Sequence, residues 1–358
     1  MTLELKEDAR ELSCVSLVVP VRDEAATIGE LLRSIAAQTR RPDEVVFVDG
    51  GSRDETVALL RDASAVVGAR VRVVEAGDAT PGRGRNVGIE AARCEWIALT
   101  DAGNRLEPDW LERLLEVVQK DESIEVVYGN YEPVTSTFFE RCAALTYPAP
   151  KHLREGELMR APFIASSLLR REVWRRVGGF PDLRAAEDLM FMEAVEREGF
   201  RTGWAPRATV HWQLRPTLAS TFRKFVLYSR HNVWAGRQRF WHYGVARQYA
   251  LAAPFLLLAI VHSAWWLLLP VAGVLARAAR SIWRRREGRS ILWALNPAQL
   301  AGVTLLILTI DLATFIGWAQ ARLRTPPEHA AQATATGKSG SESFSETRLR
   351  RNPTKQDD

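Results

Sequence analysis

The segment from Tyr249 to Ala276 has no aspartate, glutamate, lysine or arginine, and this feature most restricts how the chain can fold. A bilayer crossing needs about 20 predominantly apolar residues, and this segment is longer. A second apolar run, Leu300 to Ala319, has Asp311 as its single charge. Tryptophans near both runs are typical of headgroup level. The sequence therefore predicts two membrane segments, with two buried helices of a soluble domain as the alternative.

The predicted membrane segments cover residues 249–276 and 295–320, and a basic loop at 277–290 joins them. Arginine and lysine favour the cytoplasmic side of a membrane. The flanks before, between and after the two runs are all basic, so they cannot all be cytoplasmic if each run crosses once. Pro254 and Pro270 leave a re-entrant or shallow hairpin open as an alternative, because proline interrupts helices.

Upstream of residue 249, short apolar runs alternate with helical patterns. Strands are predicted at 15–20, 44–49, 71–74 and 96–100, and helices at 27–38, 53–66, 84–92 and 108–120. Strands that alternate with helices at this spacing predict an α/β fold with a parallel sheet. This part, residues 14–240, is predicted to be one domain. The polar tail at 325–358 is predicted to be disordered.

The formal net charge of +5 and a pI near 9.3 suit an anionic partner, such as a phosphate-bearing substrate, a membrane surface or a nucleic acid. The arginines gather beside the apolar runs and form no separate basic domain, so no nucleic acid is expected. Cys14, Cys94 and Cys142 are odd in number and far apart. This spacing argues against a disulfide framework or a zinc site and favours a reducing compartment.

Polar residues follow the first two predicted strands. The first strand ends in Pro20–Glu24, and the second ends in Asp49, followed by Gly50. Ligands of an open parallel sheet bind outside the carboxyl ends of its strands. A carboxylate there can accept a hydrogen bond from a base or a ribose, and glycine lets the backbone approach the ligand. The alternative for Asp49 is an ordinary turn or cap residue.

Charged residues in three later segments complete the candidate site. Asp101 follows another buried strand and is a candidate metal or ribose ligand, because hard cations take oxygen ligands. Arg83 and Arg85 lie at a predicted helix start, where both arginine and the helix terminus suit a diphosphate. Glu187 and Asp188 begin an amphipathic helix, and either could act as a general base. The alternative for this pair is acidic residues stabilising a helix N-terminus.

Taken in order, these segments resemble the inverting family 2 glycosyltransferases, which have the Rossmann-like GT-A fold. The resemblance covers about residues 14–235. It rests on the Pro-x-Arg-Asp-Glu loop, VDGGSRDET at 48–56, RGRNVGI at 83–89, WIALTDAG at 96–103 and GGFPDLRAAEDLMFMEAVEREGF at 178–200.

The resemblance implies roles for individual residues. Asp188 would be the catalytic base, paired with Glu187. The nucleotide-sugar donor would be bound by Pro20, Arg22, Glu24, Asp49, Gly50, Arg85 and Asp101. A divalent cation, magnesium or manganese, would be held by Asp101, with His211 nearby. The chain departs from the family's DxD motif at Gly103, which puts metal dependence in question. The helix containing FRKFVLYSR, residues 222–230, would close over the donor and lie against the membrane.

The predicted function is transfer of a hexose-type sugar, with inversion, from a nucleotide-diphosphate sugar to a lipid-linked or polysaccharide acceptor. Envelope glycolipid or polysaccharide synthesis at the cytoplasmic face of a bacterial inner membrane is the expected setting. A processive synthase and a non-catalytic GT-A scaffold protein at the membrane are the alternatives. Because all candidate site residues precede Tyr249, truncation after residue 246 is expected to release a soluble or loosely bound domain.

Overall fold

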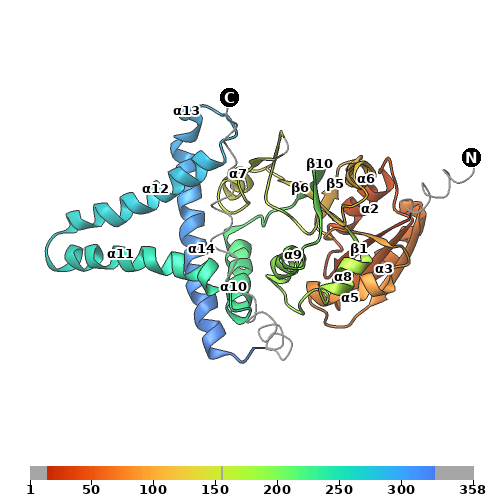
Figure 1. The fold of residues 1–358 in the computed structure, drawn as a ribbon. Coiled ribbons are helices and arrows are strands. Elements are labelled where there is room, and N and C mark those ends of the chain that lie inside the picture. The colour runs from red at the N-terminus through yellow and green to blue at the C-terminus, as the bar shows by residue number, and fades with distance from the viewer. Residues whose placement is uncertain (1–13, 155, 327–358) are drawn as a thin grey trace, which may run out of the picture.

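A computed structural model describes residues 14–154 and 156–326 and shows an α/β domain joined to a group of long helices (Figure 1). The predicted disordered tail lies outside the described residues from position 327 onward. The domain is built on an eight-stranded sheet of order β3-β2-β1-β4-β9-β6-β10-β5. Its strands are β1 (Val15–Val21), β2 (Glu44–Asp49), β3 (Arg70–Glu75), β4 (Trp96–Leu99), β5 (Asn104–Leu106), β6 (Val126–Pro133), β9 (Ser167–Arg170) and β10 (Thr202–Trp212). Strands β7 (His152–Arg154) and β8 (Glu157–Met159) form a separate hairpin.

The sheet is mixed, so the prediction of a parallel sheet is wrong in part. Strands β1 to β4 are parallel where they pair, as are β6 and β10. Strand β9 is antiparallel to both β4 and β6, and β5 is antiparallel to β10. The alternating pattern predicts where strands and helices occur. It does not predict whether a strand that inserts between two earlier strands, as β9 does between β4 and β6, runs parallel or antiparallel to them.

Helices cover both faces of the sheet and form two hydrophobic cores. One core joins the sheet to α2 (Ile28–Ala36), α3 (Thr56–Arg61), α4 (Ala63–Val67) and α6 (Trp110–Lys120). The other contains residues of α5 (Pro81–Ala91), α8 (Arg171–Arg176) and α9 (Glu187–Arg197). Successive residues of a strand point to opposite faces, and accordingly Phe47 lies in the first core and Val48 in the second. The α/β fold class is confirmed, and α2, α5 and α6 match predicted helices within a few residues, whereas the helix predicted at 53–66 is divided into α3 and α4 and α8 was not predicted.

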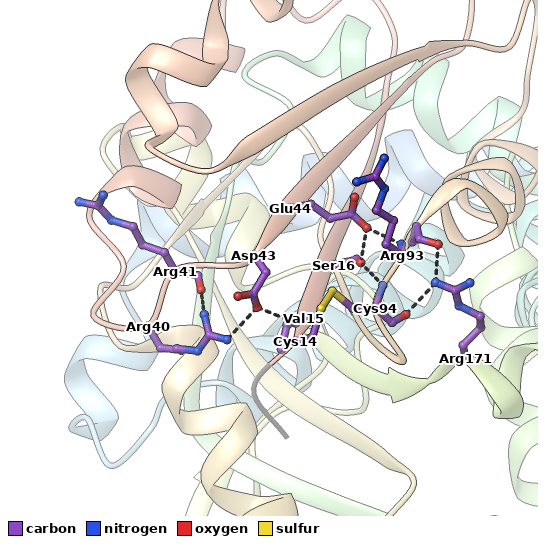
Figure 2. Close-up of a disulfide and its surroundings, with 11 residues drawn as sticks. Cys14, Val15, Ser16, Arg40, Arg41, Asp43, Glu44, Arg93, Cys94 and Arg171 are labelled. Carbon is purple, nitrogen blue, oxygen red and sulfur yellow. Dashed lines mark hydrogen bonds and ion pairs between the residues drawn. A yellow bond between two sulfur atoms is a disulfide. The ribbon is translucent and has the colours of Figure 1, made fainter. Parts of the chain in front are cut away.

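A disulfide joins Cys14 to Cys94 across 80 residues of sequence, which corrects the expectation that the cysteines form no disulfide and removes the support that they gave to a reducing compartment. Figure 2 shows its cause: Cys14 precedes β1 and Cys94 lies just before β4. These strands are neighbours, with Val15 opposite Trp96, so the two cysteines meet. The amide of Cys94 also donates to Ser16 Oγ at 3.1 Å. Sequence spacing could not reveal this pair, because strand pairing alone brings it together.

Up to residue 326, where the described chain ends, the C-terminal part contains three helices long and apolar enough to cross a membrane, at 242–261, 264–284 and 297–323. The expected single segment at 249–276 is divided between α11 (His242–Val261) and α12 (Leu268–Arg284), with a 3-10 turn (Ala264–Leu267) before α12. Pro254 lies inside α11, and Pro270 lies in the first turn of α12. The chain therefore turns at His262 and Ser263, and neither proline makes the break.

The expected basic loop at 277–290 is also different in the structure, because its first half is the end of α12. This end is docked on the α/β domain: Ser281 Oγ donates to Leu145 O at 2.7 Å, and Arg285 Nε donates to Pro148 O at 2.7 Å. The chain continues through α13 (Ile291–Ala294) into α14 (Pro297–Leu323).

In Figure 1, α11 and α12 lie side by side as a hairpin that projects away from the α/β domain. Helix α14 runs across the base of this hairpin and packs along α10 (Leu218–Trp234) and α7 (Phe138–Ala144) of the domain. The face of α10 that carries Val226 and Ser229 is thus covered by α14. Truncation after residue 246 would uncover this face. The structure therefore does not support the expected clean release of a domain.

Candidate active site

The loops that follow β1 and β2 are tied to each other by reciprocal hydrogen bonds. Asp23 donates its amide to Ser52 Oγ at 2.9 Å, and its carboxylate accepts from the Arg53 amide at 2.8 Å. The amide of Glu24 donates to Thr56 Oγ1 at 2.8 Å. Asp23 has φ 53°, a backbone conformation that is uncommon outside glycine. The Pro20–Glu24 loop is therefore held against the loop after Asp49, at the expected edge of the sheet.

Asp49 is buried at the end of β2, and both of its carboxylate oxygens accept backbone amides of the turn. Gly51 donates to Oδ2 at 3.0 Å, and Ser52 donates to Oδ2 at 3.1 Å and to Oδ1 at 3.2 Å. The alternative considered for Asp49, a turn residue, describes these contacts. Arg22 also has a partner in this region, since it forms an ion pair with Asp78.

Arg85 connects the carboxylates that the sequence placed in the site. It lies on α5, is 3% exposed, and donates from Nη2 to Asp101 Oδ1 at 2.7 Å and from Nη1 to Glu187 Oε1 at 2.9 Å. Burial opposes its charge, but Asp101 and Glu187 outweigh burial and raise the pKa of Arg85. The structure thus brings three predicted site residues together. Arg85 forms an ion pair with each of the two carboxylates, Asp101 and Glu187.

Glu187 and Asp188 begin α9, directly after Ala186, whose φ of 72° is left-handed. Burial raises the pKa of Glu187 to about 7, Asp188 adds to the rise, and Arg85 opposes it. Burial also raises the pKa of Asp188, again against the effect of Arg85. Glu187 is buried and bonded to Arg85, whereas Asp188 is half-buried. Asp188 is therefore the more accessible carboxylate, with a pKa moved toward the range that suits a general base.

Asn86, which was not among the predicted site residues, positions the loop that precedes this acidic pair. Its Nδ2 donates to Phe180 O at 2.8 Å, while its Oδ1 accepts from the Phe180 amide at 2.8 Å and from Trp174 Nε1 at 2.9 Å. Gly82, one turn earlier on α5, allows the same loop to come close. A Cβ at Gly82 would lie 2.0 Å from Pro181 O. An asparagine inside a predicted helix was the available signal, because its side chain competes with helical hydrogen bonding.

Helix α10 supplies further groups facing the carboxylates, within the segment 222–230 that the resemblance had marked. Lys224 Nζ lies 4.7 Å from the ring centre of Trp212 and 5.2 Å from that of Tyr228. Burial lowers the pKa of Lys224 to about 7, Arg215 acts in the same direction, and Asp101 opposes it. Burial raises the pKa of Tyr228, and Asp188 and Glu187 add to the rise. Arg215 was not among the predicted site residues.

His211 has a partner other than Asp101 in the structure. His211 lies on β10, and its Nε2 contacts Glu107 Oε1. Among residues 14–154 and 156–326, one group of three potential metal ligands occurs, Cys14, Asp43 and Cys94, and its two cysteines form the disulfide. Asp101 remains 41% exposed, with Oδ1 directed to Arg85. A Cβ at Gly103 would meet no atom within 4 Å, so that position is open space.

The site thus combines strand-end loops, a buried arginine and an acidic pair at one edge of the sheet of an α/β domain, an arrangement that suits a nucleotide-sugar transferase. The profile described as glycosyl transferase family 2 matches residues 16–173, and the profile described as glycosyl transferase family group 2 matches residues 96–316. The second match covers more than half of the chain. The chain therefore belongs to the family 2 glycosyltransferases and has the GT-A fold.

Individual relatives match over shorter stretches. The succinoglycan biosynthesis protein ExoO of Rhizobium meliloti (strain 1021) is 40% identical over 103 residues, covering 28% of this chain and 29% of the relative. The glycosyltransferase EpsJ of Bacillus subtilis (strain 168), whose function is uncharacterised, is 28% identical over 199 residues, covering 52% of this chain and 57% of the relative. These matches span well under two thirds of either relative.

A solved structure shows the same fold over most of the chain. It is the mannosyltransferase PcManGT from Pyrobaculum calidifontis, in complex with GDP-Man and Mn2+. The TM-score is 0.56 at 22% sequence identity, and the alignment covers 89% of this chain and 94% of that one. The similarity confirms the GT-A fold class and extends into the C-terminal helices.

Proposed function

We propose that this glycosyltransferase moves a sugar, with inversion, from a nucleotide-diphosphate donor to a lipid-linked or otherwise membrane-delivered acceptor. The observation that supports it best is the junction at Arg85. This one buried guanidinium holds Asp101, at a strand end, beside the Glu187–Asp188 pair at the start of α9. In this proposal Asp101 serves the donor and Asp188 serves the acceptor, and both lie at one edge of the sheet.

Asp188 is the base in this proposal. It removes the proton of the acceptor hydroxyl while that oxygen attacks the anomeric carbon from the side opposite the diphosphate. The new carbon–oxygen bond forms as the bond to the diphosphate oxygen breaks, so the configuration inverts and the nucleoside diphosphate leaves with the electron pair. General base catalysis of this kind contributes roughly 10²–10⁴-fold. Arg215, whose charge acts on Glu24 and Lys224, would provide positive charge near the leaving group.

The donor would be bound by the strand-end loops that carry Pro20, Arg22, Glu24, Asp49 and Gly50. Their mutual hydrogen bonds make this surface rigid before a donor arrives. Asp49 contributes by holding the turn that would meet the nucleoside, with its oxygens already bonded to amides.

A divalent cation, magnesium or manganese, fits this site with Asp101 as its single carboxylate ligand. Asp101 is partly exposed and has a second oxygen beyond the one that Arg85 contacts. Such cations often use one or two carboxylates, several waters and the substrate phosphates. The cation would neutralise charge on the departing diphosphate. His211 is left out of this ligand set because it contacts Glu107.

The cellular setting that we propose is envelope glycolipid or polysaccharide synthesis at the cytoplasmic face of a bacterial inner membrane. Three apolar helices support membrane association. Names of the bacterial relatives, such as the succinoglycan biosynthesis protein, support the pathway class.

A donor screen tests the proposal. The full chain, purified in detergent, is incubated with UDP- and GDP-sugars and a membrane lipid extract, with and without EDTA, beside the variant Asp188→Asn. Sugar incorporation into lipid by the unchanged chain, lost in Asp188→Asn, is expected. If every donor fails to transfer although a nucleotide binds, the chain is a non-catalytic scaffold.

A further inference from the structure

The hairpin of α11 and α12 is fastened at its base to one residue of α14. Tyr249 Oη donates to Asp311 Oδ2 at 2.9 Å. Arg277 donates to the same carboxylate from Nη1 at 2.6 Å and from Nη2 at 3.0 Å. The two residues that border the uncharged segment therefore meet at Asp311, and everything between them extends away from α14 and returns.

Helices α11 and α12 as a whole are long enough to cross a bilayer, but the uncharged part of each arm beyond the attachment at Asp311 is shorter than a crossing. At 1.5 Å per residue, the helical stretch from Tyr249 to Val261 is about 20 Å long, and that from Ala264 to Ala276 is similar. The hydrocarbon core is about 30 Å thick, and a crossing helix needs about 20 apolar residues. Apolar stretches of this shorter length are typical of re-entrant segments.

Helix α14 is long enough to cross a bilayer, but it contacts the α/β domain along most of its length. Near its start, Val303 and Leu306 share a core with Cys142 of α7. Near its end, Gly317 lies against α10, where an added Cβ would be 2.4 Å from Val226 O, and Trp234 Nε1 donates to Ala321 O at 3.4 Å. From Val303 to Ala321 the helix is about 27 Å long.

These contacts bear on where α14 can lie, because α10 belongs to the catalytic domain and carries charged side chains. It carries Arg223, Lys224, Arg230 and His231. Arg230 also contacts Gln320 of α14 at 3.4 Å. If α14 crossed the bilayer, it would draw α10 and α7 into hydrocarbon, where charged groups are costly. The helix must therefore lie along the surface of the membrane, between the domain and the lipid.

We propose that this chain is monotopic: α11 and α12 dip into the bilayer from one side and return, and α14 lies in the interface. The occupant of the hairpin surface is the hydrocarbon of an anionic bilayer. Large apolar side chains cover the hairpin without a protein partner to bury them, with Ile260 84% and Trp265 78% exposed. The exposed Arg247 and Arg280 lie at its base, where anionic headgroups would attract them.

The proposal also accounts for the charge pattern. A hairpin that enters and leaves on one side places the basic flanks at both of its ends on that side. An interfacial α14 keeps the basic residues after it, Arg322 and Arg324, on the same side again. All three basic flanks then satisfy the preference of arginine for the cytoplasmic side. The conflict found under two single crossings does not arise.

Cysteine labelling of the full chain tests the proposal without any need for activity, so its result is independent of the proposed reaction. Four variants are placed in sealed vesicles of both orientations and exposed to a membrane-impermeant maleimide, then again after detergent. They are Ala264→Cys at the hairpin tip, Arg247→Cys at its base, Leu292→Cys in α13 just before the start of α14, and Leu323→Cys at the end of α14. The unchanged chain gives the background. Cys142, buried at 2% exposure, should stay unlabelled in every folded variant.

We expect the base and both ends of α14 to be labelled from one and the same side. The tip should be labelled from neither side until detergent is added. Labelling of Ala264→Cys from the side opposite to Arg247→Cys would show that the hairpin crosses, and labelling from the same side would show that it is not inserted. Labelling of Leu292→Cys and Leu323→Cys from opposite sides would show that α14 crosses. Any of these three results overturns the proposal.

Discussion

At the scale of single residues, the first prediction concerns the pH dependence set by Asp188. Burial raises the pKa of this carboxyl. A base must be deprotonated, so kcat/KM should fall as pH drops through a midpoint above the usual aspartate value of about 3.9. Asp188→Asn should lower turnover by roughly 10²–10⁴-fold and flatten this acidic limb while nucleotide affinity is retained.

Glu187→Gln is the comparison for that prediction. It removes a buried negative partner of Arg85 but leaves Asp188 in place. The acidic limb of the pH profile should persist in this variant. If the limb instead disappears in Glu187→Gln and remains in Asp188→Asn, the roles of the two carboxylates are exchanged.

The second prediction at this scale concerns the disulfide. Closing a loop between residues 80 positions apart is expected to stabilise the fold by about 2–4 kcal/mol. Cys14→Ser should therefore lower the thermal midpoint measured in detergent without reductant. Addition of dithiothreitol should bring the unchanged chain down to the same value and leave Cys14→Ser unaffected. Equal midpoints without reductant would mean that the disulfide contributes no net stability.

Local chemistry decided which site residues the sequence could predict. Asp49 and Asp101 follow strands, and Asp188 lies in the first turn of a helix. The sequence can predict such positions as parts of a site, because the carboxyl ends of parallel strands share one edge of a sheet. Side-chain pairings between distant segments are not readable in this way. The contact of His211 with Glu107 and the three hydrogen bonds of Asn86 depend on how the segments fold together.

At the scale of elements, the close approach of α5 to the loop before α9 should be sensitive to one methyl group. In Gly82→Ala the new Cβ would meet Pro181 O at 2.0 Å and Glu187 Cβ at 3.3 Å. Overpacking of this kind costs about 1–3 kcal/mol, and the shift of the loop should also lower kcat. The matched control Gly103→Ala meets nothing within 4 Å and should keep the thermal midpoint. Equal midpoints for both variants would contradict this account of α5.

Helices and strands could be predicted where one hydrophobic pattern is clear. They could not be predicted where contacts between distant segments determine where a helix ends or which face is buried. The fully buried β2 was predicted with its observed ends, because a short apolar run rich in valine and bounded by polar residues favours a strand over a helix. The apolar segment 249–276 has no glycine or proline at its actual turn, His262–Ser263, so its division into two helices was not visible. The partial burial of α14 was equally hidden, since a helix covered by α10 and a helix covered by lipid share a composition.

At the scale of the whole molecule, α10 stands between catalysis and the membrane. Lys224 and Tyr228 lie on its side toward the carboxylates. On another side, Ser229 Oγ donates to the carbonyl of Thr314 in α14 at 2.7 Å. A helix with its side chains is about 10–12 Å in diameter. With α14 at the interface, the site is therefore separated from the lipid by little more than these two helices, which suits an acceptor whose reactive end stays at the membrane surface.

This arrangement predicts the result of removing the hairpin while α14 stays docked. Tyr249 and Arg277 both contact Asp311, so a short glycine–serine linker can replace residues 251–275 without separating the helix ends. The shortened chain should fold and bind nucleotide, because the strand-end loops and Arg85 are untouched.

On anionic liposomes it should float at low salt through its arginines, at about 1 kcal/mol for each basic residue near the surface. It should be released at 1 M salt, where screening shortens to roughly 3 Å. The full chain should float at both salt concentrations, since hydrophobic insertion is not screened. Equal retention of the two proteins at 1 M salt would show that α14 and the basic surface suffice as the anchor, and that the hairpin has another partner.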